Sequence, residues 1–168
     1  TGLVYGTNEV SIVTGGTERV KIDTNGLKFN GDTAAANALD DYEEGVWSLT
    51  PTGGTWNVSR AFYVKIGRKV TIHFSGSITN ATNADVSFTL PFIADTSTSA
   101  GTGVGIESHG NCMINLGTPP SNIYNAAAYC YGSLAYIYYS RVGAAWVKAV
   151  GAYIGSNLQF TATYTSAP

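Results

Sequence analysis

The feature that most constrains this chain is the strict alternation of side chains over residues 68–79, with the sequence RKVTIHFSGSIT. Successive side chains of a β-strand point to opposite faces, so this alternation predicts a strand with one buried face. The positions expected on the buried face are Val70, Ile72, Phe74, Gly76 and Ile78. The opposite face is expected to carry Lys69, Thr71, His73, Ser75 and Ser77.

Further strand-like segments follow along residues 46–168, with turn residues and no helical pattern between them. They are ADVSFTLPF, VGIESHGNCMINLG, AAYCYGSLAYIYYS, AWVKAVGAYIG and NLQFTATYT. Strands spaced by roughly ten to fifteen residues predict an all-β fold, here an antiparallel, jelly-roll-like β-sandwich over residues 46–168. A segment of this length can bury a core of its own.

The charge of the chain excludes several classes of partner. Only 12% of the 168 residues are charged, the formal net charge is -2, and no basic block is present. Nucleic acids and anionic membranes require dense positive charge, so neither is expected as a partner. No apolar run approaches the roughly 20 residues that span a bilayer, so no membrane insertion is expected.

Residues 1–32 carry a different pattern of short segments, EVSIVTGG, ERVKIDTNG and LKFNGD, each with few apolar residues. The pair Asn25-Gly26 predicts a hairpin, because both positions of such a turn favour positive φ. A meander of such short strands cannot bury a core alone. Residues 1–32 are therefore predicted to form a β-rich shaft in which several copies of the chain share one apolar axis.

Residues 33–45 begin as an alanine-rich run that predicts a short helical neck with Asp32 or Thr33 as its N-cap. A helix of about three turns is marginal in isolation, which again favours association of copies. The run ends in four carboxylates, Asp40, Asp41, Glu43 and Glu44. A solvated collar is the simpler interpretation of this cluster, and a cation held between chains is the alternative.

Three motifs give the chain a family resemblance. They are ALDDYEEGVWSLTP, FYVKIGRKVTIHFSGSI and LPF, preceded by ERVKIDTNGLKFNGD. In this order they resemble the C-terminal regions of bacteriophage tail-fibre and receptor-binding proteins, which carry an LDDYEEGTWTP element, a YxKIGxxV strand and an LPF turn. The resemblance covers most of the chain and is most specific over residues 39–51 and 63–70. Val46 and Ser48 replace the usual threonines.

The resemblance implies a homotrimeric fibre end on the outside of a virion, on a tail or head fibre, that binds a host-surface receptor. In such fibres the receptor is often a glycan. It also implies that Trp47 is a packing anchor where the neck meets the head. The competing functions are a purely structural, trimerising or capsid-decorating domain, a glycan depolymerase, and recognition of a protein receptor.

The sequence offers little for catalysis. Cleavage of a glycan requires two carboxylates about 5 to 10 Å apart. Beyond residue 44 the carboxylates are Asp85, Asp95 and Glu107. His73 and His109 lie in separate segments, no nucleophile elbow is present, and the two cysteines and two histidines lack ligand spacing. We therefore expect no enzyme activity, no catalytic residue, no metal and no cofactor.

Binding is better supported, because the chain has 11 tyrosines, many of them late in the sequence. Tyr and Trp stack on a sugar ring and hydrogen-bond through their polar edge. Alternate tyrosines in AYCYGSLAYIYY are expected to divide between the core and the sheet surface or trimer interface. The ligand-binding candidates, all from turn-rich stretches, are Trp56, Asn122, Tyr124, Tyr139, Arg141 and Trp146. For each of them a structural role is the competing interpretation.

Overall fold

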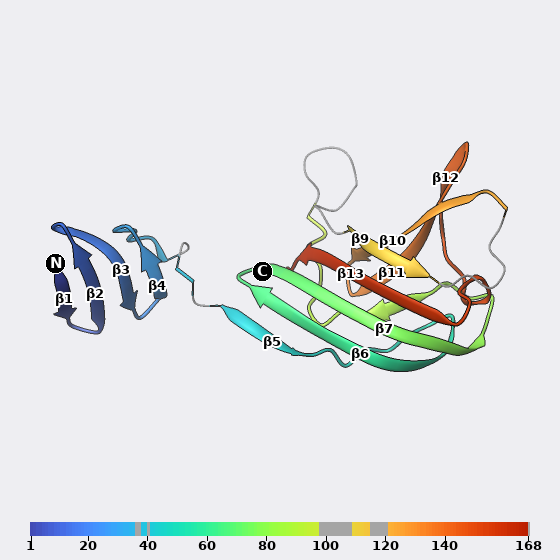
Figure 1. Cartoon of the computed structure of the whole chain (residues 1–168), viewed down its shortest axis with the longest axis horizontal. Helices are drawn as coiled ribbons and strands as arrows, with labels where there is room; N and C mark the ends of the chain where they lie inside the picture. The colour runs from blue at the N-terminus through green and yellow to red at the C-terminus, as the bar shows by residue number, and fades with distance from the viewer. Residues whose placement is uncertain (36–37, 40, 98–108, 115–120, 168) are drawn as a thin grey trace. The chain divides into compact units, whose positions relative to one another are not determined.

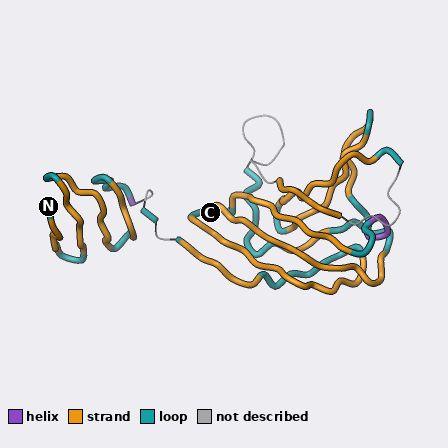
Figure 2. Tube along the Cα trace, viewed as in Figure 1, coloured by secondary structure: helices purple, strands orange, loops and turns teal. Residues whose placement is uncertain are grey.

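The computed structural model describes residues 1–35, 38–39, 41–97, 109–114 and 121–167. Strands make up most of the described chain and all of their pairings are antiparallel, which confirms the predicted all-β class (Figure 2). The chain divides into two compact units, Thr1–Tyr42 and Glu43–Pro168. Within the described residues, no helix has the length and apolar character to cross a bilayer.

The first unit is a four-stranded meander whose strands pair in chain order. Its strands are β1 (Gly2–Gly6), β2 (Glu9–Thr14), β3 (Thr17–Asp23) and β4 (Gly26–Phe29) (Figure 1). The hairpin predicted at Asn25-Gly26 is present, but its turn lies one residue earlier, because Asp23 pairs with Gly26. Asp23 Oδ1 accepts a hydrogen bond from the Asn25 backbone N–H at 2.8 Å, which stabilises this turn.

One face of this sheet is apolar across all four strands. The register aligns Leu3, Ile12, Val20 and Phe29 in one row, and Tyr5, Val10, Ile22 and Leu27 in the next. The opposite face is charged, with Lys21 bonded to Glu9 and Lys28 to Asp23. Among the described residues of this unit only Ser11 and Lys28 are buried, so the described part of the unit does not cover its own apolar face.

The helical neck predicted over residues 33–45 is wrong for the described part of that segment. Leu39 pairs with Leu27 through two backbone hydrogen bonds of 2.8 and 3.2 Å, and β5 occupies Tyr42–Val46. A helix here would place carboxylates at the negative end of its dipole, whereas a strand gains ladder hydrogen bonds. Asp40, one of the four carboxylates, lies outside the described residues.

The second unit is one large antiparallel sheet with the order β12-β11-β10-β9-β13-β7-β6-β5, and β8 pairs with β11. Its further strands are β6 (Gly54–Ile66), β7 (Lys69–Ala81), β8 (Ser87–Thr89), β9 (His109–Ile114), β10 (Ile123–Tyr131), β11 (Leu134–Arg141), β12 (Ala144–Lys148) and β13 (Asn157–Thr165). A short 3-10 helix, η2, spans Gly151–Tyr153. The order is a series of hairpins with β13 inserted between β7 and β9, and it differs from the double Greek key of the predicted jelly roll.

The sheet of the second unit folds over on itself, and the segment between β5 and β6 joins its two halves through β8. The segment between β5 and β6 pairs with β8 through the Pro51–Phe88 bridge, and the Thr52 backbone N–H donates to Ser87 O at 2.8 Å. The same segment returns to β6, because the Trp47 backbone N–H donates to Ala61 O at 3.0 Å. The two halves therefore face each other as a sandwich and enclose one core (Figure 1).

Aromatic rings fill the centre of this core. Phe74 on β7 lies 5.2 Å from Phe160 and 5.9 Å from Trp56 between ring centroids. Trp47 is 2% exposed, and its Nε1 donates to Thr89 O at 2.7 Å, so it packs as expected for an anchor. The alternation predicted for β7 is confirmed. The buried residues of this strand are Val70, Ile72, Phe74, Gly76 and Ile78.

Candidate functional site

Two of the six candidate ligand-binding residues are core residues. Trp56 packs edge-on against Phe74 and Phe88, and its Nε1 donates to Thr52 O at 2.9 Å. Tyr139 is 1% exposed, its hydroxyl donates to Tyr153 O at 3.4 Å, and burial raises its pKa. The structural interpretation fits both residues, and their surroundings do not support a contact with a ligand.

Three other candidates lie on the surface near the end of the β10–β11 hairpin. Tyr124 is 81% exposed, and Asn122 is exposed and accepts the Val142 backbone N–H at 3.1 Å. Arg141 Nε donates to Ala145 O at 3.1 Å, so part of its guanidinium holds the turn between β11 and β12. These three residues are not brought together with Trp146 in one hollow.

Trp146, the sixth candidate, stands on β12 and is 56% exposed. It lines an apolar hollow of about 500 Å³ on the outside of the sandwich. The other residues that line this hollow are His109, Ala127, Ala128, Tyr129 and Tyr138. We call these six residues the aromatic hollow. They come from β9, β10, β11 and β12, four strands that are neighbours in the sheet.

Strand register explains why the surface is hollowed at this point. Ala127 pairs with Tyr138 on β11 and with Asn111 on β9, and Tyr138 pairs with Lys148 on β12. A small side chain in the middle of this row leaves space between its larger neighbours. Trp146 lies two residues before Lys148 and therefore presents its side chain on the same face of β12.

Outward-facing tyrosines continue the aromatic surface beyond the hollow. The rings of Tyr129 and Tyr131 are stacked at 6.3 Å, and Tyr129 meets Tyr138 edge-on at 5.9 Å. Lys148 Nζ lies 4.3 Å from the centre of the Tyr136 ring. The expected division of alternate tyrosines between core and surface is thus observed, with Tyr139 inside and these four outside.

The side chains of the hollow are suited to contact an uncharged molecule with a flat face. Partial burial, together with Tyr131 and Tyr138, raises the pKa of Tyr129, so its hydroxyl remains a hydrogen-bond donor at neutral pH. No carboxylate lines the hollow among the described residues, and His109 is its only titratable imidazole there. Such a surface offers flat apolar faces with a few polar edges, which suits the C–H faces and hydroxyls of a sugar ring.

The described carboxylates of the sandwich beyond Glu44 are engaged elsewhere. Asp85 pairs with Lys148 at 3.4 Å, and Asp95 pairs with Arg68. Hydrogen bonds from Ser97 and from Arg68 lower the pKa of Asp95 to about 2, whereas a general acid requires a raised pKa. Glu107 lies outside the described residues.

Metal ligation has no visible site in the described part of the chain, where no group of three or more His, Cys, Asp or Glu side chains converges. Cys112 and Cys130 are thiols that form no disulfide, and burial raises the pKa of each to about 12. Thiols in this state behave as small apolar side chains rather than as ligands or nucleophiles.

Sequence reasoning named Trp146 as a candidate but did not name Tyr129, Tyr138 and His109, which line the hollow with it. The sequence did carry a signal for this hollow. Ala127 and Tyr129 alternate along one strand, and Tyr138 and Tyr136 alternate opposite them on the next. No protein-family model, curated protein or solved structure matches this chain.

Proposed function

We propose that this chain is the C-terminal part of a trimeric bacteriophage fibre, displayed on the outside of the virion, that binds a host-surface polysaccharide for adsorption. The motifs LDDYEEGVWSLTP, YVKIG and LPF support the assignment to phage fibres by resemblance. The aromatic hollow around Trp146 is the observation that carries the binding role.

The hollow suits weak, repeated binding of a neutral sugar unit. Trp146 and Tyr138 provide apolar faces for stacking, and the Tyr129 hydroxyl provides a donor beside them. A shallow site of this kind binds weakly by itself. Three copies in one fibre end, engaging one polysaccharide surface together, gain affinity through high effective concentration.

The first unit supports the trimeric shaft. Its apolar face includes Tyr5, Leu3 and Ile22, with 73%, 58% and 55% of their surfaces exposed in a single chain. Exposed apolar faces of this kind are typical of surfaces covered by a partner. Three copies that pack these faces around a shared axis would remove them from water, and the charged faces with Lys21 and Lys28 would remain outside.

Adsorption of the purified chain to host cells tests the binding role, and the test compares Trp146→Ala with Tyr124→Ala. Both are exposed aromatic residues, but only Trp146 lines the hollow. Loss of an aromatic anchor that a ligand covers costs about 2 kcal/mol or more, so Trp146→Ala is expected to weaken binding at least about tenfold per site. Tyr124→Ala is expected to bind like the parent chain.

Two outcomes would contradict this assignment. A folded Trp146→Ala chain that adsorbs normally would remove the hollow from the site, and a loss confined to Tyr124→Ala would move the site to the start of β10. Failure of the folded, associated parent chain to bind any host cell or extracted polysaccharide would favour the structural role. The uncovered apolar face of the first unit is the observation that supports that second function.

A depolymerase is the least supported function, because Asp85 and Asp95 are held in ion pairs. Release of reducing ends from host polysaccharide by the purified chain would establish it.

A further inference from the structure

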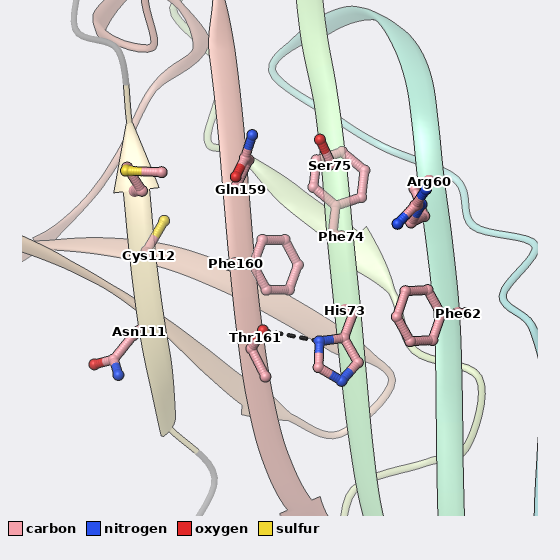
Figure 3. A pocket seen from close by; sticks show the side chains of 11 residues that line it. Arg60, Phe62, His73, Phe74, Ser75, Asn111, Cys112, Gln159, Phe160 and Thr161 are labelled. Carbon is pink, nitrogen blue, oxygen red and sulfur yellow. Dashed lines mark hydrogen bonds between the residues drawn. The ribbon is translucent and has the colours of Figure 1, made fainter.

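A second hollow, of about 490 Å³, lies on the outward face of β6, β7, β13 and β9 (Figure 3). Six of its polar or charged residues are Arg60, His73, Ser75, Asn111, Gln159 and Thr161. Phe62 and Met113 contribute apolar surface at its two sides. We call these eight residues the polar platform.

The strand register builds the platform as two straight rows across four strands. Phe62 pairs with His73, His73 with Thr161 and Thr161 with Asn111 in the first row. Arg60, Ser75, Gln159 and Met113 pair in the same way in the second row. Directly opposite residues on one face lie about 4.5–5.5 Å apart between Cβ atoms. The two rows together are therefore wide enough for one or two sugar rings.

The imidazole of His73 is fixed in position from two sides. Its ring stacks on Phe62 with centroids 4.5 Å apart and planes 16° from parallel. Thr161 Oγ1 lies 3.0 Å from His73 Nδ1, as the dashed line in Figure 3 shows. When Nδ1 accepts the threonine hydroxyl, Nε2 carries the hydrogen and can donate to a bound molecule.

Arg60 supplies the charge of the platform, and its side chain makes no ion pair or hydrogen bond with a described residue. Its guanidinium can bind a carboxylate through two parallel hydrogen bonds. The described residues that line the hollow include no Asp or Glu, although the chain as a whole carries a net charge of -2. The platform is thus complementary to a negative ligand.

The remaining groups specify a hydroxylated ligand. The amides of Gln159 and Asn111 can each donate and accept hydrogen bonds, as sugar hydroxyls do. Phe62 offers an apolar edge beside Arg60 on the same strand. All of these side chains stand on paired strands rather than on loops, so little ordering is needed on binding.

We propose that the polar platform is a second binding site that takes the carboxylated sugar units of an acidic polysaccharide. Arg60 binds the carboxylate, His73 Nε2 and the two amides bind hydroxyls, and Phe62 contacts the ring. The platform is continuous with the aromatic hollow, because Asn111 of the platform pairs with Ala127 of the hollow. The choice of a saccharide rests on the proposed function, whereas the preference for negative charge rests on the platform alone.

Calorimetric titration of the full chain with polygalacturonate fragments, and with dextran fragments of equal length, tests this inference. The parent chain is expected to bind the acidic fragments better than dextran. Removal of a charge-assisted hydrogen-bonding partner costs about 1.5–3 kcal/mol, so Arg60→Gln is expected to weaken acidic binding at least about tenfold. Arg60→Lys retains the charge but cannot form two parallel hydrogen bonds. Its affinity for the acidic fragments is expected to lie between those of the parent chain and of Arg60→Gln.

Arg141→Gln is the matched control, because Arg141 is another arginine of the second unit and lies outside the platform. It is expected to bind polygalacturonate like the parent chain, with circular dichroism confirming that every variant is folded. Equal binding of dextran, no binding of polygalacturonate, or a loss seen with Arg141→Gln and not with Arg60→Gln would each overturn the proposal. Tighter binding of dextran sulfate that survives Arg60→Gln would reduce the effect to unspecific charge and would also overturn it.

Together with the adsorption test, this experiment can reject the polar platform and the aromatic hollow independently of each other. Binding of polygalacturonate that depends on Arg60, with host adsorption indifferent to Trp146→Ala, supports the platform and rejects the aromatic hollow. Adsorption that depends on Trp146, without any Arg60-dependent acidic binding, rejects the platform and leaves the proposed function in place.

Discussion

The two units of this chain follow the same alternation of apolar and polar side chains, yet they bury very different amounts of apolar surface. In the first unit the alternation produces one apolar face, with Ile22 and Phe29 more than half exposed. In the second unit it produces a closed core in which Ile72, Phe88 and Leu158 are fully buried. The local pattern is similar, and the difference lies in what covers the apolar face.

Closure of the sheet accounts for the difference. The second sheet is long enough to fold over on itself, with its halves joined through β8 and the segment around Pro51, so its apolar faces cover each other. The four short strands of the first unit cannot fold back in this way, and isolated small sheets with one apolar face are marginally stable in water. We therefore expect the second unit to fold by itself and the first to depend on other copies of the chain.

The largest expected effect is on association, where Ile22→Asp is compared with Val4→Asp. The two side chains have similar exposure, 55% and 52%, but they lie on opposite faces of the first sheet. A carboxylate on the face that copies cover would have to be desolvated, at a cost of several kcal/mol or more, so Ile22→Asp is expected to abolish association. Light scattering measures the mass of each variant, and equal association of the two variants would show that the apolar face is not the surface that copies cover.

The next effect concerns the core of the second unit, where Phe74→Ala removes a ring in contact with Trp47, Trp56 and Phe160. Loss of a buried phenylalanine costs about 3–5 kcal/mol, and the free energy of unfolding of the second unit should fall by that amount. Phe29→Ala is the control, because Phe29 belongs to the first unit and is 52% exposed. Denaturant unfolding followed by tryptophan fluorescence reports on the second unit, since all three tryptophans lie there. A similar loss in the control would contradict the independence of the second unit.

The smallest effect is a dependence of the second unit on acid pH. Hydrogen bonds from Ser97 and Arg68 lower the pKa of Asp95 to about 2 in the folded chain, against about 3.9 in an unfolded chain. Ionised Asp95 therefore stabilises the folded state above about pH 4. This stabilising contribution is lost as the pH falls from about 4 to about 2. Asp95→Asn should lower Tm at neutral pH and flatten its dependence on pH in this window.

Thr96→Ala, a change at an exposed neighbour of Asp95, is the control for this titration and should keep the slope of the parent chain. A parent profile and an Asp95→Asn profile that run parallel from neutral pH to pH 2 would show that the Asp95–Arg68 pair does not contribute to folding.

Local periodicity made much of the fold predictable from sequence. The alternation around Phe74 identified the buried face of β7, and the segment NLQFTATYT coincides with β13. The prediction of a helical neck was wrong because the helix propensity of alanine is a weak preference, which the pairing of this segment with strands overrides. In the folded chain Leu39 and Tyr42–Val46 pair with strands instead.

The site was less predictable because it depends on which strands become neighbours. Trp146 was chosen as a candidate from its turn-rich surroundings, but His109 and Tyr129 join it in the hollow only through the pairing of β9 with β10. Trp56 was misjudged because TGGTW resembles a loop, whereas β6 begins at Gly54 and directs the indole into the core. Arg60 gave no local signal, since its platform is assembled from four strands.

We infer that the first unit obtains from other copies the cover that the second unit provides for itself. Sedimentation equilibrium of the full chain, with hydrogen exchange measured on the same sample, distinguishes a trimer from a single chain. We expect three times the chain mass of 17.6 kDa at micromolar concentration, with protected amides in β1–β4. A mass of 17.6 kDa with the same protection would contradict it, because the apolar sheet would then be stable without a partner.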